Sequence, residues 1–202
     1  MRPASNYASL RRILIATTNE NKLKEIRPLL TAPREGVPSP VMAWDLVTLA
    51  DLPPVAEPEE TGATFWENAR IKALAYAQAS GLITVAEDSG FEVDALGGEP
   101  GVRSARFLGS AATYEERFAA IYRRLNGRPS TARFVTALAV ARGGEVIFET
   151  ETAVEGMVAD SPRGQHGFGY DPIFLYVPWK TTTAEMTDED KSLNAEAIAT
   201  DL

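Results

Sequence analysis

The apolar positions of this chain follow two different spacings, and these spacings predict strands alternating with helices. Apolar runs over residues 12–17 and 82–86 predict buried strands, and the first run leads directly into a polar turn. Apolar residues spaced three and four apart over 22–30 predict a helix after that turn. The many prolines of residues 31–59 predict a loop, with one short strand near 41–49.

Two capping boxes mark the beginnings of further helices. In residues 64–67 and 113–116 a threonine is followed three positions later by a glutamate. The first box predicts a helix that ends at Gly81, and the second predicts a helix that ends at Asn126-Gly127. A polar cap over residues 184–191 predicts a last helix, which the end of the sequence cuts short.

The second half of the chain has the pattern of a hairpin. Residues 131–141 predict a long strand, Gly143-Gly144 a tight turn, and residues 145–158 the returning strand. The alternation within the first strand leaves apolar residues on both of its faces, so both faces are expected to be partly covered.

Composition excludes several classes of site and partner. The chain has no cysteine and a single histidine, His166, which excludes disulfides, thiolate metal sites and a histidine-rich metal site. Acidic residues outnumber lysine plus arginine by 28 to 20 without a long basic run, so no nucleic-acid partner is expected. No apolar run reaches the roughly 18 residues that span a bilayer, and residues 1–12 lack a signal-peptide core. A cytoplasmic protein without a membrane partner is therefore expected.

The strand predicted over 82–86 ends on the first candidate functional residues, Glu87, Asp88, Ser89 and Gly90. Acidic side chains that close a buried strand need water, a cation or a hydrogen-bond donor. Gly90 permits a tight backbone path that would present Asp88 and Ser89 to a ligand. The same residues also suit an ordinary Asp-Ser-Gly turn, so both interpretations stay open here.

A second candidate site lies where the first strand meets the first helix. The turn over 17–21 would direct free backbone N–H groups and the helix dipole at an anion, and Lys22 would add a charge. The glycine and lysine pattern of a Walker loop is missing. A capped helix with solvated lysines is the alternative interpretation.

The helix that begins near residue 65 carries a third set of candidates. Asn68 and Lys72 are four residues apart and share one face, and Glu60 precedes the helix, where it can face a site. Alternatively, Asn68 and Lys72 form a solvated face and Glu60 is a favourable charge near the helix N-terminus.

A glycine-rich segment over 162–174 completes the candidates. Phe168, between two glycines, could stack on a flat ring, and Asp171 could accept hydrogen bonds from N–H groups of that ring. The alternative is a glycine-rich turn with aromatic residues in the core. His166 is expected to be a loop histidine without a catalytic role.

In this order and at these spacings, the motifs resemble the inosine and xanthosine triphosphatases, a family of pyrophosphatases for noncanonical purine nucleoside triphosphates. The matching segments are residues 17–22, 59–62, 65–69 with Lys72, 87–90 and 167–174, and residues 96–102 and 104–107 are also similar. The resemblance runs from about Ile13 to Lys191. It implies an α/β fold in which a long twisted mixed sheet with flanking helices forms two lobes around a central cleft.

The resemblance also implies a single pyrophosphatase domain over residues 1–202, assembled as a homodimer. The implied reaction is Mg2+-dependent hydrolysis of inosine, deoxyinosine and xanthosine triphosphates to the monophosphate and pyrophosphate. That reaction would cleanse the nucleotide pool.

Roles for individual residues follow from the same resemblance. Glu60 and Asp88, with Glu87 close behind, would hold Mg2+, which prefers carboxylate oxygens. Asp88 would also take a proton from the attacking water, and with Lys72 and Glu60 it forms the implied catalytic set. The implied substrate-binding residues are Thr17, Thr18, Asn19, Glu20, Asn21, Lys22, Asn68, Ser89, Phe168, Gly169, Tyr170, Asp171 and Lys191.

After Lys191 the chain departs from the family pattern. Family members follow this lysine with Ser-His-Arg-Gly, whose His and Arg read the 6-oxo edge of the purine, and continue through a C-terminal helix. Here no His or Arg follows Lys191, and that helix is expected to be truncated. A site without those donors loses the basis of base discrimination. Two alternatives therefore stay open: an impaired or binding-only relative that has lost base selectivity, and a nucleoside triphosphate pyrophosphatase of other base preference. Glu87 is a further departure, because bacterial members often carry Asp there.

Overall fold

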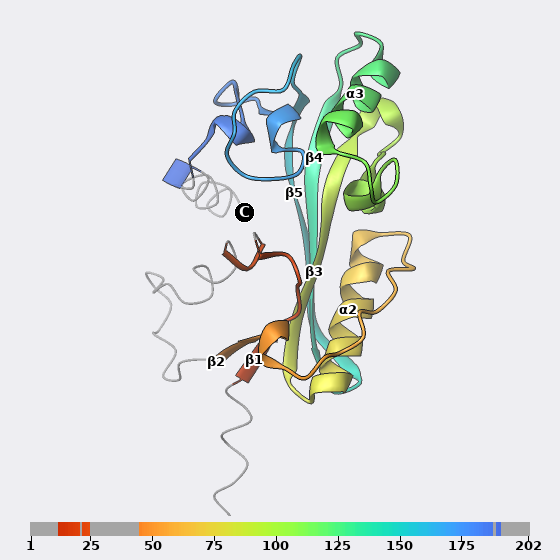
Figure 1. Ribbon diagram of the computed structural model, residues 1–202, viewed down its shortest axis with the longest axis vertical. Coiled ribbons are helices and arrows are strands. Elements are labelled where there is room, and N and C mark those ends of the chain that lie inside the picture. Colours follow the sequence, from red (N-terminus) through yellow and green to blue (C-terminus); the bar gives the residue numbers. More distant parts are fainter. Residues whose placement is uncertain (1–11, 21, 25–44, 188, 191–202) are drawn as a thin grey trace, which may run out of the picture. The chain divides into compact units, whose positions relative to one another are not determined.

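A computed structural model describes residues 12–20, 22–24, 45–187 and 189–190. The strands are β1 (Arg12–Ile15), β2 (Asp45–Thr48), β3 (Ile83–Val93), β4 (Thr131–Arg142), β5 (Glu145–Val158), β6 (Phe174–Tyr176) and β7 (Thr181–Thr182). The longer helices are α2 (Phe65–Ser80) and α3 (Tyr114–Leu125) (Figure 1). Residues 20 and 22–24 are also helical, and the rest of the helix predicted over 22–30 lies outside the described residues. Within the described ranges, no helix has the length and apolar character needed to cross a membrane.

The strands form one sheet in the order β2-β1-β3-β4-β5-β6-β7. β1 pairs in parallel with both neighbours, so that Ile13 lies opposite Leu46 on β2 and Ile83 on β3. β6 pairs antiparallel with β5 and with β7. β4 and β5 are joined at Gly143-Gly144, where the hairpin turn was predicted. The sheet is therefore mixed, and the predicted α/β fold class is confirmed.

The chain divides into two compact units. Unit 1 comprises Met1–Asp88 and Thr136–Thr152, and unit 2 comprises Ser89–Val135 and Ala153–Leu202. The division crosses β3 between Asp88 and Ser89, and both β4 and β5 contribute to each unit. The single domain of two lobes around a cleft stays a prediction.

β3 is longer than its apolar run, so the prediction that this strand ends on two acids is wrong. Extended backbone continues from Ile83 through Glu87, Asp88 and Gly90 to Val93. Glu87 and Asp88 are each only 8% exposed. Because hydrogen-bonding partners offset the penalty of burying these carboxylates, the strand does not have to end where the apolar residues do.

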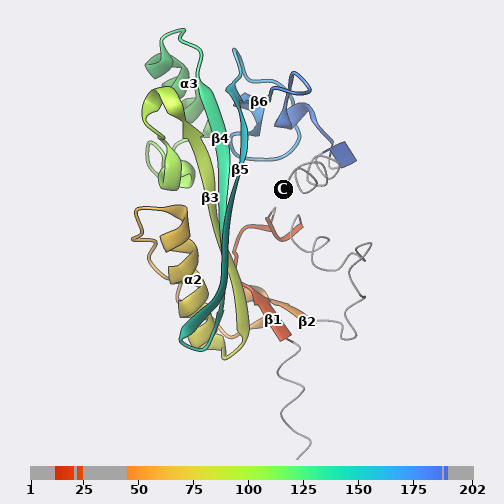
Figure 2. The ribbon, with the colours of Figure 1, turned by 180° about the vertical axis from the view of Figure 1, so that it is seen from behind.

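In unit 1, α2 begins and ends where its sequence predicts. The Thr64 hydroxyl oxygen accepts a hydrogen bond from the backbone N–H of Glu67, and Gly81 closes the helix with a left-handed φ of 69°. The helix lies along one face of the sheet (Figure 2). Its residues with the least exposure are Phe65, Asn68, Ala69, Ala73, Tyr76 and Ala77.

On β4, alternate alanines at 137, 139 and 141 are fully buried and the residues between them are half-buried. This confirms that both faces of the strand are at least partly covered.

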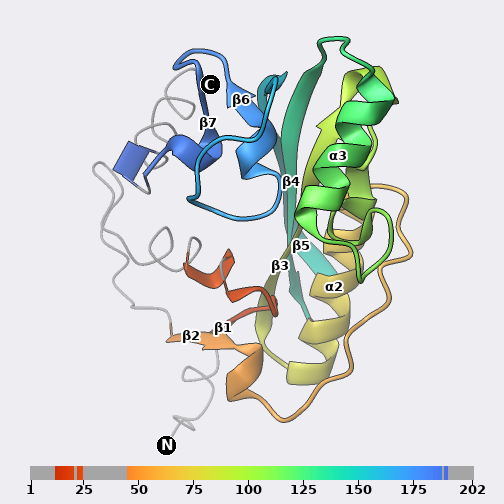
Figure 3. The same ribbon diagram turned by 45° about the horizontal axis from the view of Figure 1, so that its top comes forward.

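Unit 2 is built around aromatic rings. Phe91 on β3 stacks on Tyr170 with ring centroids 5.1 Å apart, and its ring meets Phe174 edge-on at 6.0 Å. Phe118 and Ile121 join the same core from α3, which is shown in Figure 3. α3 follows its predicted capping box and ends at Asn126, which has a left-handed φ of 50°. Aromatic pairs at these separations stabilise a core beyond the area they bury.

Two short elements agree with the sequence in part. β2 covers the second half of the strand predicted near 41–49. Thr187 accepts a hydrogen bond from the backbone N–H of Asp190, as expected for a helix cap in this region. Residues 189–190 are helical, and the rest of the predicted last helix lies outside the described residues, as does Lys191.

Candidate active site

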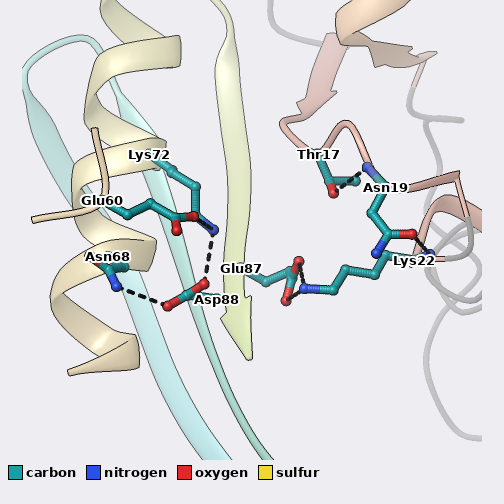
Figure 4. Close-up of polar contacts among 8 residues, drawn as sticks. All are labelled: Thr17, Asn19, Lys22, Glu60, Asn68, Lys72, Glu87 and Asp88. Atoms are coloured by element: carbon teal, nitrogen blue, oxygen red, sulfur yellow. Dashed lines mark hydrogen bonds and ion pairs between the residues drawn. The ribbon is translucent and has the colours of Figure 1, made fainter. Parts of the chain in front are cut away.

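Unit 1 holds two clusters of charged side chains on opposite faces of β3 (Figure 4). Successive side chains of a strand point to opposite faces, so Glu87 and Asp88 diverge although they are neighbours in sequence. Asp88 faces α2, and Glu87 faces the turn that follows β1. The two acids therefore belong to different clusters.

The first cluster is centred on Lys72 of α2. Its ammonium nitrogen lies 2.9 Å from Oε1 of Glu60 and 3.1 Å from Oδ1 of Asp88. The side chains of Lys72 and Asp88 are only 13% and 11% exposed. One cation thus joins two carboxylates that come from a loop and from a strand, and the catalytic role of these three residues stays a prediction.

Asn68 supports this cluster from one helical turn before Lys72. It is completely buried, and both polar atoms of its amide have protein partners. Its Oδ1 accepts a hydrogen bond from the backbone N–H of Gly62 at 2.8 Å, and its Nδ2 donates to Oδ2 of Asp88 at 3.1 Å. Asn68 thereby fixes both the loop that carries Glu60 and the carboxylate of Asp88, a positioning role that differs from direct substrate contact.

Position 62 must be glycine because the side chains of Asn68 and Glu67 lie too close to its Cα to leave room for a Cβ. A Cβ at this position would lie 2.7 Å from Oδ1 of Asn68 and 2.7 Å from Cβ of Glu67, which is shorter than side-chain contacts allow. The sequence offered a signal for this residue, because Gly62 stands two positions after Glu60 in one of the recognised segments.

We expect Gly62→Ala to lower the free energy of unfolding by about 1–3 kcal/mol and to reduce turnover, because relief of the overlap must move Asn68. Gly144→Ala is the matched control, since nothing lies within 4 Å of a Cβ at that hairpin glycine. Thermal unfolding and turnover of the two variants check the prediction. Equal stability of both variants would contradict it.

Charge sharing explains how this cluster titrates. Burial alone would lower the pKa of Lys72, but the charges of Asp88 and Glu60 outweigh burial and raise it, so Lys72 stays protonated. Burial raises the pKa of Asp88 above its ordinary 3.8, with Lys72 and Asn68 opposing this rise in part. Both pKa values can rise together. Lys72 interacts with several carboxylates, whereas Asp88 has one nearby ammonium to set against its burial and the like charge of Glu60.

The second cluster pairs Lys22 with Glu87. The Lys22 ammonium donates to both carboxylate oxygens of Glu87, at 2.7 and 2.9 Å. Asn19 anchors the same turn, because its Oδ1 accepts from the backbone N–H of Lys22 at 3.4 Å. Thr17 accepts in turn from the backbone N–H of Asn19 at 3.2 Å. Thr18 and Glu20 are exposed in this turn.

The predicted base-binding segment lies in unit 2. Asp171 accepts a hydrogen bond from the backbone N–H of Phe168 at 3.0 Å and another from the Thr183 hydroxyl at 2.9 Å, so both its oxygens hold the loop. The ring of Tyr170 is buried in the core, and its hydroxyl donates to the carbonyl of Ser104 at 2.9 Å. The alternative of a turn with core aromatics therefore describes Tyr170, whereas Phe168 and Gly169 are half-buried.

The remaining sequence candidates are placed as follows. Ser89 is half-buried and begins unit 2, and His166 is exposed in its loop, where its backbone N–H donates to the carbonyl of Ala184 at 2.9 Å. Asn21 and Lys191 lie outside the described residues.

Two of the three carboxylates predicted to hold a metal ion, Glu60 and Asp88, lie in one cluster, and the third lies in the other. Among the described residues, no group of three or more His, Cys, Asp or Glu side chains is arranged to hold a metal. Glu60 and Asp88 meet around Lys72, while Glu87 is paired with Lys22 on the other face of β3. A pair of carboxylates fits Mg2+, which commonly takes one or two protein oxygens together with water and substrate phosphates.

Known proteins match this chain over most of its length. Residues 13–198 match the sequence model of the Ham1 family. The chain is 44% identical over 183 residues to a dITP/XTP pyrophosphatase of Thermus thermophilus, covering 90% of this chain and 84% of that protein. It is 41% identical over 186 residues to the dITP/XTP pyrophosphatase of Bacillus subtilis, covering 91% and 89%.

Solved structures agree in fold. The Ham1 protein of Staphylococcus aureus superposes with a TM-score of 0.77 at 33% identity, covering 90% of this chain and 89% of that one. A nucleoside-triphosphatase, named dITP/XTP pyrophosphatase, from Mycobacterium abscessus gives a TM-score of 0.75 at 39% identity, covering 95% and 98%.

Proposed function

The chain belongs to the Ham1 family, and from this premise we propose that it hydrolyses dITP, ITP and XTP to the monophosphate and pyrophosphate. The observation that carries the proposal is the Lys72 ammonium held between Glu60 and Asp88 in unit 1. This arrangement offers a cation for phosphate and a carboxylate for a proton at one place. The named relatives are enzymes for the same class of nucleotide.

In the proposed mechanism, Lys72 turns from the two carboxylates to the triphosphate, where its charge stabilises the negative charge that develops in the transition state. Oδ2 of Asp88 accepts from Asn68, so Oδ1 is the oxygen that Lys72 releases and that takes the proton of the attacking water. Glu60 and Asp88 would hold Mg2+. When bound, this ion supplies charge neutralisation at the phosphates and makes the water more acidic.

Lys22 and the turn over 17–21 form the second part of the proposed phosphate site, and Ser89 would donate to a phosphate. Phe168 and Gly169 would contact the base, together with Lys191. Tyr170 and Asp171 support that segment through the core and through the loop hydrogen bonds. A cytoplasmic location stays a prediction from the sequence.

The direct test is incubation with Mg2+ and, separately, inosine, xanthosine, guanosine and adenosine triphosphates, with pyrophosphate resolved from orthophosphate. We expect pyrophosphate to form mainly from the inosine and xanthosine forms. Equal turnover of all four would instead indicate a pyrophosphatase with other or lost base preference. Absence of pyrophosphate with every nucleotide would refute the proposed function and support a binding-only relative.

We also propose that the protein is a homodimer. On β5 of unit 1, Ile147 and Phe148 are 48% and 56% exposed, and as neighbours in a strand they present one apolar side chain on each face, one of which a second copy would bury. Light scattering should give twice the mass of one chain. Phe148→Glu should shift the population toward monomer, whereas Val177→Glu, which changes a similarly exposed residue of unit 2, should not. A monomeric mass at all concentrations would exclude the dimer.

A further inference from the structure

The Glu87 carboxylate binds the ammonium of Lys22, the lysine that would contact phosphate in the proposed site. Both of its oxygens accept from the Lys22 ammonium, at 2.7 and 2.9 Å (Figure 4). The side chains of Lys22 and Glu87 are only 20% and 9% exposed, so water screens this pair less than it screens a surface pair. The ammonium that would attract an oxyanion is thus already bound to one.

We propose that Glu87 is a positioning residue for Lys22 and an internal competitor for the phosphate chain at that lysine. The inference rests on the proposed function, because the anion it concerns is the triphosphate or the pyrophosphate product. It assigns Glu87 to the anion site and separates it from Glu60 and Asp88, the proposed metal ligands.

The geometry of β3 supports the assignment of Glu87 and Asp88 to different sites. Strand alternation directs Glu87 away from the face on which Asp88 meets Lys72 and Asn68. The Lys22 end of the pair is anchored independently, because Asn19 accepts from the backbone N–H of Lys22. Glu87 therefore fixes the ammonium while the turn fixes the backbone, and together they set where Lys22 can reach.

The negative charge of Glu87 determines whether this residue strengthens or weakens the binding of phosphate at Lys22. A phosphate that approaches Lys22 must share the ammonium with Glu87 or displace it, and it meets the like charge of the carboxylate in either case. Glu87 therefore lowers the affinity of Lys22 for anions. Weaker binding of the product favours its release, whereas tight binding of substrate and product alike would not accelerate the chemical step.

The experiment is calorimetric titration of inorganic pyrophosphate into the full chain, without divalent metal and with EDTA, at constant pH and ionic strength. The proteins are wild type, Glu87→Gln, Lys22→Met and the double variant. Glu99→Gln is the matched control, since Glu99 binds Arg124 through two oxygens at 2.7 and 3.0 Å in unit 2 and its replacement changes net charge equally. Glu87→Asp, which keeps the charge on a shorter stem, guards against a general defect of folding.

We expect Glu87→Gln to bind pyrophosphate at least about fivefold more tightly than wild type, and Lys22→Met to bind about tenfold more weakly. The double variant should bind pyrophosphate as weakly as Lys22→Met does. Glu99→Gln should bind it with the same affinity as wild type. The affinity of Glu87→Asp for pyrophosphate should lie between those of wild type and Glu87→Gln.

Unchanged or weaker binding by Glu87→Gln would overturn the inference, as would a gain that persists without Lys22. No binding by any of the proteins would overturn it as well. Release of pyrophosphate from ITP by the wild type with Mg2+, measured on the same preparation, would leave the proposed function standing in each of those cases. If the wild type released no pyrophosphate from ITP, the proposed function would be refuted, whatever the result for Glu87.

Discussion

Asp88→Asn should reduce turnover by at least about 10²-fold while the protein remains folded, because the amide cannot accept the proton of the attacking water. The substitution keeps the shape of the side chain but places an NH2 group against a donor. That donor is Asn68 Nδ2 in one orientation of the new amide and the Lys72 ammonium in the other. One buried hydrogen bond is lost either way, which costs about 1–3 kcal/mol.

Turnover of ITP together with thermal unfolding checks this prediction. Asp160→Asn, at an exposed position of unit 2, is the control for an Asp to Asn change away from the cluster. Near-normal turnover of Asp88→Asn would remove Asp88 from the mechanism. A complete loss of folded protein would show that its role in unit 1 is mainly structural.

Lys72→Met should abolish most turnover and should destabilise the protein at neutral pH. The methionine fills a similar volume but leaves Glu60 and Asp88 close together without their shared cation. Removal of one member of a buried pair costs up to about 3–5 kcal/mol, and the residual exposure of these side chains reduces this to about 1–3 kcal/mol.

Acidification should restore part of the lost stability. Burial and the charge of Glu60 already raise the pKa of Asp88 in the folded protein, and the loss of Lys72 raises it further. The folded state then binds a proton more readily than the unfolded chain, so the stability of the variant relative to wild type increases as pH falls through the raised pKa. The recovery should level off as the pH falls below the ordinary value of 3.8, where Asp88 is protonated in the folded and the unfolded chain alike.

The difference in unfolding midpoint between wild type and Lys72→Met, followed across this pH range, tests the assignment. A constant difference would show that Lys72 stabilises the site through packing instead of charge. Lys180→Met, a change at an exposed lysine of unit 2, controls for the loss of one positive charge.

Local signals in the sequence were sufficient to predict the ends of α2 and α3. The capping boxes at Thr64 and Thr113 are complete in the structure, and Gly81 and Asn126 take the left-handed conformations that end α2 and α3. Each of these features depends on residues within a few positions of one another.

β3 shows where local reasoning failed. Two acids after an apolar run suggested the end of a strand, yet extended backbone continues through them to Val93. Their burial depends on Lys72, Asn68 and Lys22, which lie 16, 20 and 65 residues away in sequence. No local pattern predicts such partners, although strand alternation would have separated Glu87 from Asp88 if the strand had been extended.

Residue types and short spacings were enough to identify the family, the α/β class and the ends of α2 and α3. The burial of Asn68, the place of Tyr170 in the core and the pairing of Glu87 with Lys22 depend instead on how distant segments pack. The physical reason is that a side chain's partner is set by the face to which its strand or helix directs it. That direction becomes a contact only when distant segments pack together.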